Sequence, residues 1–167
     1  MNTRDVTNTL TTLFHELIDG PPADVAYMLN RGDQGLLRSL DKLSAAEASS
    51  SATGGASIAA HVDHLRYGLS LMNRWSEGEN PFDTADWGAS WRIAAVSEAE
   101  WQDLRTRLRD EAARWLETLG TPREVSGDEL SGVVASIAHL AYHLGAIRQI
   151  NRSARGPADP HLAGPQG

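Results

Sequence analysis

The sequence predicts an all-α protein, a four-helix bundle with a short extra helical element in its first connection and a disordered C-terminal tail. Three observations lead to this fold class. Apolar residues recur at helical spacing along four long segments, no segment alternates as a strand would, and turn-forming residues separate the segments. A chain of 167 residues fits one domain. We assign residues 1–153 to the bundle and the Pro- and Gly-rich residues 154–167 to a flexible tail.

Two helical elements are expected in the first part of the chain. The first runs over residues 5–18, with its apolar side chains on one face. Gly20 can then adopt the left-handed conformation that ends a helix, and the two prolines after it cannot continue one. A shorter element is expected in "GLLRSLDKL", residues 35–43. The small, polar and Gly-rich residues 44–57 predict a flexible connection.

Three longer helices are expected in the remainder. The first of these covers residues 57–78, and an aromatic, turn-rich loop follows over residues 79–96. Ser97 and Glu100 fit a capping box, in which a Ser at the helix start is followed three residues later by a Glu. The helix that they open should stop at Gly120, and the last long helix follows it.

Composition excludes several classes of function. The chain has no cysteine, so disulfides, thiolate metal sites and a catalytic cysteine are excluded. Its net charge is −7 and it has no dense block of Lys and Arg, which argues against binding to nucleic acid. The N-terminal residues lack the charged and then apolar pattern of a signal peptide. We therefore expect a cytoplasmic protein without a nucleic-acid partner.

One window, residues 130–147, contains no Asp, Glu, Lys or Arg and is just long enough to raise the question of a membrane span. It holds two histidines and two glycines, and no second window of this kind accompanies it. A helix that is apolar all round in a soluble protein is a buried central one. We therefore expect this helix at the centre of the bundle and no membrane partner.

His139 and His143 lie four residues apart in that window, so on a helix they share one face. Two imidazoles at this spacing can bind one metal ion, although the residues between them lack the glutamate base of a zinc metalloprotease. A pair of hydrogen-bonded core histidines is the alternative interpretation. A buried polar group without a partner costs about 1–3 kcal/mol, and a metal ion together with hydrogen bonds from the other ring nitrogens would remove that cost.

A third ligand is expected from the helix over residues 57–78. His61 and His64 both fall on its apolar side, and the periodicity, which slightly favours His61 as the more central, does not choose between them. Two helices that direct histidines to one interior indicate a metal site more strongly than either helix alone. His15, beside Glu16 in the first helix, and His161, in the tail, are weaker candidates.

Two stretches resemble the DinB-like superfamily of metal-binding four-helix bundles, which includes the YfiT-like proteins. These are "HLRY" after "SIAAHVD" and "AHLAYHLGAIRQI" in the last helix, and the resemblance extends from the first helix to about Asn151. It implies three histidine ligands to a divalent metal ion, which correspond to His64, His139 and His143. The extra His61 is then a residue behind the ligands or an alternative ligand.

The resemblance also implies a function. Three neutral imidazoles leave exchangeable positions on the ion, as in a catalytic site. Similar proteins are metal-dependent transferases of low-molecular-weight thiols, of the mycothiol or bacillithiol type, or related isomerases and hydrolases. We expect a small-molecule substrate, zinc, nickel or iron as the metal, and a homodimer. A non-catalytic metal- or ligand-binding module, or a dimerisation module, is the alternative, because fold and ligands do not fix a reaction.

Five further residues are candidates for a pocket beside the metal. Trp87 and Trp91, in the loop over residues 79–96, can wall its mouth, with core packing as the alternative. The hydroxyl groups of two tyrosines near the histidines can donate to a bound group, and the Arg after the His pair can bind a carboxylate or form a surface salt bridge. These three residues are Tyr67, Tyr142 and Arg148.

Overall fold

The computed structural model describes residues 3–22, 24–52 and 54–158. This part of the chain is all-helical and contains no β-strand, apart from an isolated bridge between Ser51 and Ser57, so the predicted all-α class is confirmed. The α-helices are α1 (Thr3–Asp19), α2 (Gly35–Asp41), α3 (Ala45–Ala48), α4 (Ile58–Ser76), α5 (Glu98–Gly120) and α6 (Gly127–Ile150). Three 3-10 turns, η1 (Phe82–Thr84), η2 (Ser90–Arg92) and η3 (Arg152–Ala154), complete it.

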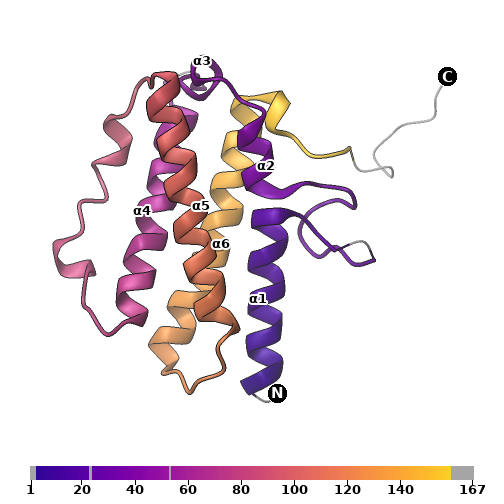
Figure 1. Ribbon diagram of the computed structural model, residues 1–167, viewed down its shortest axis with the longest axis vertical. Coiled ribbons are helices and arrows are strands. Elements are labelled where there is room, and N and C mark those ends of the chain that lie inside the picture. Colours follow the sequence, from indigo (N-terminus) through magenta and orange to yellow (C-terminus); the bar gives the residue numbers. More distant parts are fainter. Residues whose placement is uncertain (1–2, 23, 53, 159–167) are drawn as a thin grey trace.

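Four long helices, α1, α4, α5 and α6, lie side by side along the length of the molecule (Figure 1). α4 packs against α5 and α6, and α1 packs against the same two helices. The short helices α2 and α3 lie at the end of the molecule where α4 and α5 begin (Figure 1). The two helices that carry most of the histidines, α4 and α6, are therefore direct neighbours.

The helix boundaries follow from local capping. Gly20 has φ of +97°, the left-handed conformation that was expected at the end of α1. Ser97 and Glu100 form the predicted capping box of α5, in which each side chain bonds the other residue's backbone N–H. α5 ends at Gly120, and its Trp101 and Trp115 are buried in the core.

The connection over residues 44–57 was expected to be flexible, and this is wrong for its first part. Ser44 and Glu47 form a second capping box, which starts α3. Ala45 and Ala48 of this helix are buried. The sequence contains this pattern of Ser44 followed three residues later by Glu47, but it lies in a run of small residues that is also typical of a flexible connection. The predicted single short element is thus two short helices, α2 and α3.

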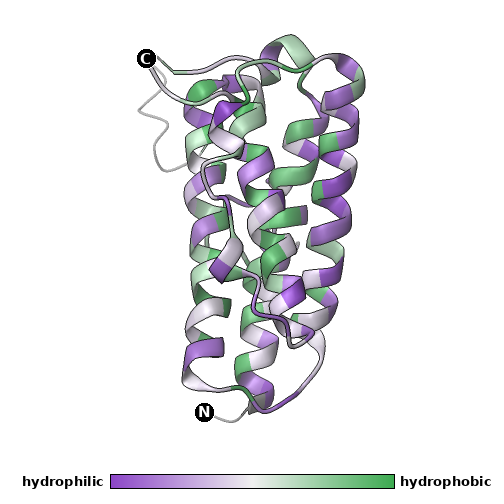
Figure 2. Cartoon of the chain, turned by 90° about the vertical axis from the view of Figure 1, so that its left-hand side faces the viewer, coloured by the Kyte–Doolittle hydropathy of each residue, from purple (hydrophilic) through white to green (hydrophobic). Residues whose placement is uncertain are grey.

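The expectation that α6 is buried all round is also wrong. Six of its residues, including Val133, Leu140 and Ile147, are buried, but Val134 is 50% and Tyr142 71% exposed, and Ala138 lies on the same outward side. α6 is long and apolar enough to cross a membrane by length and composition, and 33% of that window is buried. It packs against α1 and α4 along its buried side. Hydrophobic and hydrophilic residues are mixed along each helix in Figure 2.

The first residues of the predicted tail over 154–167 pack against the body. Ala154 is fully buried, and its carbonyl oxygen accepts a hydrogen bond from Arg148 Nε at 3.1 Å. The carbonyl oxygen of Pro157 accepts one from Asn30 Nδ2 at 2.9 Å. Residues 159–167 lie outside the described residues. Within the described part, the chain is therefore anchored up to Pro157.

Candidate metal centre

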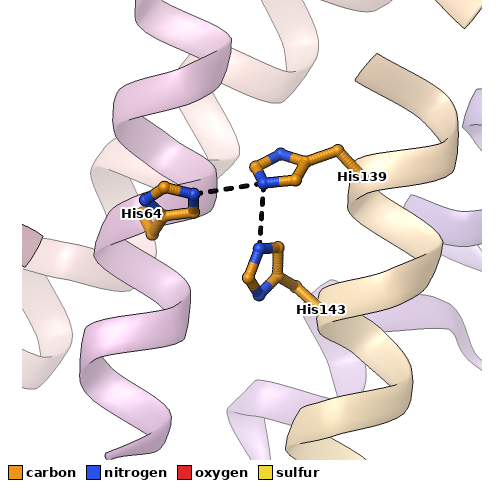
Figure 3. Close-up of side chains that lie close together, drawn as sticks. All are labelled: His64, His139 and His143. Atoms are coloured by element: carbon orange, nitrogen blue, oxygen red, sulfur yellow. Dashed lines mark hydrogen bonds between the residues drawn. The ribbon is translucent and has the colours of Figure 1, made fainter. Parts of the chain in front are cut away.

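Three histidines from two neighbouring helices meet at one point (Figure 3). His64 projects from α4, and His139 and His143 project from adjacent turns of α6. The Nε2 atom of His139 lies 3.1 Å from His64 Nε2 and 2.9 Å from His143 Nε2. One ligand atom from each residue lies within 4.8 Å of the other two. These are the three residues named by the family resemblance.

Hydrogen bonding alone does not satisfy this arrangement. A neutral imidazole nitrogen carries either one hydrogen or one in-plane lone pair, so His139 Nε2 can make one good hydrogen bond but faces two nitrogens. A cation that accepts all three lone pairs removes the conflict. Two nitrogens on one tetrahedral zinc ion lie roughly 3.3 Å apart, close to the observed separations. The three residues therefore fit a metal ion.

His61 lies behind this cluster and is bonded to one of its members. Its Nδ1 lies 2.8 Å from Nδ1 of His143, whose Nε2 faces His139. The two nitrogens of the His143 ring thus have different partners. A histidine ligand commonly uses its second nitrogen in this way to fix the orientation of the ring. His61 is not one of the three clustered histidines and contacts only the outer nitrogen, Nδ1, of His143 among their hydrogen-bonding atoms.

Burial keeps the cluster neutral. His64 and His143 are 8% and 3% exposed. Desolvation, followed by the nearby His139 and His61, lowers the pKa of His64 to about 4. The same causes, with a further effect of His64, lower the pKa of His143 to about 3. Burial also lowers the pKa values of His61 and His139. Neutral imidazoles offer the lone pairs that a metal ion requires.

The loop over residues 79–96 covers the histidines with two tryptophans. The ring centroid of Trp91 lies 4.4 Å from that of His64, and that of Trp87 lies 5.6 Å from it. Trp91 also lies beside His61 and His143. Both tryptophans were expected to wall the mouth of a pocket. Trp87 lines a cavity between α4 and α6, whereas Trp91 packs on the histidine cluster outside that cavity.

Two hydrogen bonds tie this loop to α4. Ser90 Oγ donates to Asp63 Oδ2 at 2.6 Å, and the other Asp63 oxygen is bonded to Arg66. The hydroxyl oxygen of Tyr67 accepts a hydrogen bond from the backbone N–H of Asp86 at 3.1 Å. Tyr67 therefore positions the loop and does not line the cavity. The contact between Asp63 and Ser90 was not predicted, because the two residues are 27 positions apart and no local sequence pattern joins them.

Two pocket candidates lie elsewhere. Tyr142 is 71% exposed; its ring is 5.0 Å from that of His143, but it does not line the cavity. Arg148 Nη2 donates to Asp33 Oδ1 at 2.7 Å in a largely buried ion pair that holds the end of α6. Arg148 does not line the cavity beside the histidines. Its Nε also donates to the Ala154 carbonyl of η3, and Gly156 lies against the Asp33 carboxylate.

His15 is not part of the cluster. His15 lies on α1 and pairs with Asp19, whose carboxylate oxygen is 3.7 Å from its Nε2. His161 lies outside the described residues.

Comparisons with protein-family models, with curated proteins and with solved structures find no match to this chain.

Proposed function

We propose that the chain is a DinB-like four-helix bundle that binds one divalent metal ion through His64, His139 and His143. The observation that carries this proposal is the convergence of three Nε2 atoms, from two helices, on one point that hydrogen bonding does not satisfy. The packing of α1 and α4 against both α5 and α6 supports the bundle. The last-helix motif "AHLAYHLGAIRQI" supports the family.

We propose a separate role for each of the residues at this site. His139 and His143 hold the ion from one helix, and His64 holds it from the other. His61 fixes the ring of His143 through the Nδ1 contact. Trp91 shields His64 and His143 on one side. When bound, zinc, nickel or iron would supply a Lewis acid that lowers the pKa of a thiol or polarises a carbonyl.

The reaction that we propose is the transfer of a low-molecular-weight thiol, of the mycothiol or bacillithiol type, to or from a small organic substrate. The support is electrostatic. All three ligands are neutral imidazoles, and the cluster includes no carboxylate among the described residues. No ligand from the described residues would therefore be anionic, which favours an anionic fourth ligand such as a thiolate. A related isomerase or hydrolase would also use a metal ion that is held by three neutral ligands and binds an anion.

A second candidate, a dimerisation module, has one observation in its favour. The outward side of α6 carries exposed apolar residues, including Val134 and Tyr142. We propose that the chain forms a homodimer through this side of α6, whether or not it has a catalytic activity. We also propose a cytoplasmic location, which suits a chain without cysteine.

Metal analysis tests the proposed site. Protein prepared with a chelator is dialysed against zinc or nickel, and its metal content and melting temperature are measured. We expect one ion per chain and a higher melting temperature. No uptake and no thermal shift would leave the histidines as core residues. A screen of low-molecular-weight thiols with electrophiles, with and without metal, then tests turnover. An adduct that forms only with metal present supports the enzyme over the module.

A further inference from the structure

A cavity of about 710 Å³ lies between α4 and α6, directly beside His64 and His139. Ligand pockets for small molecules have volumes in this range. α4 and α6 form its two long walls, and residues of the loop over 79–96 close a further side. The cavity extends along α4 from His64 to Trp75, which are eleven residues apart, or roughly 16 Å on a helix. It is therefore elongated, with the histidines at one end.

Small residues create this space. On α6 the wall is made by Gly132, Ala135 and Ala138, and on α4 Gly68 faces His139 and Trp87. A Cβ added at Gly68 would meet those two rings at 3.8–3.9 Å, an ordinary contact distance, so the absent side chain leaves room. At Gly132 a Cβ would lie 2.6 Å from the Trp75 ring. Glycine there lets Trp75 pack onto α6 at the end far from the histidines.

The cavity wall is apolar and uncharged. Its larger members are Leu65, Leu69, Met72, Trp75, Phe82 and Trp87. Among the described residues no Asp, Glu, Lys or Arg lines it, and apart from the two indole rings its polar side chains are His64, His139 and Ser136. The hydroxyl group of Ser136 is already used, because it donates to the Val133 carbonyl and accepts from Trp115 Nε1. Free ligating groups are thus confined to the histidine end.

We propose that this cavity binds an elongated, uncharged and mainly apolar molecule whose single polar group lies at the histidine end. For that polar group the proposal rests on the proposed metal site, whereas the apolar part depends on the cavity alone. A sugar-containing thiol does not suit this wall, because its hydroxyl groups would be buried without partners. In the proposed thiol transfer, the cavity would therefore hold the apolar reaction partner.

Straight-chain alcohols test the apolar part on metal-free protein. Binding of 1-butanol, 1-hexanol and 1-octanol is measured by calorimetry and by tryptophan fluorescence, because two of the five tryptophans, Trp75 and Trp87, line the cavity. Each added methylene should tighten binding about fourfold, so 1-octanol should bind on the order of 100-fold more tightly than 1-butanol. Octanoate and octylammonium should bind more weakly than 1-octanol, because the wall offers no counter-charge. Affinity that is independent of chain length would overturn the proposal.

Two cavity-filling variants and a matched control locate the binding. Gly68→Leu and Ala135→Leu place side chains in the cavity without removing a histidine. Gly120→Leu adds the same side chain to the exposed end of α5, away from the cavity and from the outward side of α6, where a Cβ meets nothing within 4 Å. Each filling variant should weaken 1-octanol binding at least tenfold, and the control should bind as the wild type does. Unchanged binding in both filling variants would show that the alcohol binds elsewhere.

The polar end is tested with 1-hexanethiol and 1-hexanol, which differ only in the head group. With zinc bound, the thiol should bind at least tenfold more tightly than the alcohol, and without zinc the two should bind similarly. An equal affinity with zinc bound would remove the histidine end from the proposal. Zinc content is measured on the same samples. Normal alcohol binding without zinc uptake would overturn the proposed metal site alone, and zinc uptake without alcohol binding would overturn this inference alone.

Discussion

Nδ1 of His61 lies 2.8 Å from Nδ1 of His143, while Nε2 of His143 faces Nε2 of His139 at 2.9 Å. One ring of the His61–His143 pair donates and the other accepts. His61 therefore fixes His143 in the orientation that directs its Nε2 to the three-histidine cluster. The two histidines of α4 thus have different places, His64 in the cluster and His61 behind it.

The two histidines of α4 should respond differently to truncation. We expect that His64→Ala eliminates stoichiometric metal, because it removes one of three ligands. His61→Ala should weaken metal affinity by about 10–100-fold, the usual cost of removing a group that orients a ligand. The measurement is metal content and affinity of both variants, purified and dialysed identically. Loss of metal in His61→Ala with retention in His64→Ala would reverse the assignment.

The pair on α6 should be required for metal binding but not for the fold. We expect His139→Ala and His143→Ala to bind no stoichiometric metal and to keep a helical circular dichroism spectrum, since the core residues of α6 remain. His15→Ala is the control, because His15 lies on α1 with Asp19 and outside the cluster. Full metal content in both α6 variants would contradict the proposed site.

The stability of the metal-free protein should fall in mildly acidic solution. In the folded protein the pKa of His64 is lowered to about 4 and that of His143 to about 3, whereas in the unfolded chain both pKa values are near 6.5. Between about pH 6.5 and pH 3 the unfolded chain therefore binds more protons than the folded protein. Stability is therefore full above about pH 6.5 and falls as the pH decreases toward 3–4. Urea unfolding midpoints across this range measure it. The double variant His64→Asn, His143→Asn should show a shallower decrease, and an equal decrease would show that other groups cause it.

Metal binding should persist to lower pH than an ordinary histidine site allows. Protons compete with a metal for an unperturbed imidazole at about pH 6. Burial lowers the pKa values of all three ligands, so proton competition begins at lower pH. A zinc titration at pH 7, 6 and 5 checks this. A tenfold loss of affinity between pH 7 and 6 would contradict the expected neutral cluster.

The two sides of α6 should differ in their tolerance of substitution. Val134 is 50% exposed on the outward side, so Val134→Lys should change the free energy of unfolding by no more than about 0.5 kcal/mol. Leu140 is 1% exposed, so Leu140→Ala should cost about 2–5 kcal/mol. Denaturant titrations of the two variants give both values. A large loss in Val134→Lys would instead indicate that this side of α6 is covered in solution, as in the proposed homodimer.

The local features of the fold follow from the amino-acid sequence alone. Ser97 and Glu100 start α5, Gly20 ends α1, and the spacing of His139 and His143 puts both rings on one face of α6. Each of these depends on residues within one or two helical turns, where backbone geometry relates sequence distance directly to position in space. The all-α class follows from the same periodicity.

The tertiary structure decided which residues meet across helices. His61 and His64 are about 60° apart around α4, and both fall on its apolar side, so only the rotation of α4 against α6 places His64 in the cluster. The exposed side of α6 could not be found from a window that is apolar all round, because such a pattern carries no direction. The cavity likewise depends on Trp87, which a hydrogen-bonded loop folds back onto α4. These contacts depend on packing between segments that are distant in the sequence, so no local sequence pattern encodes them.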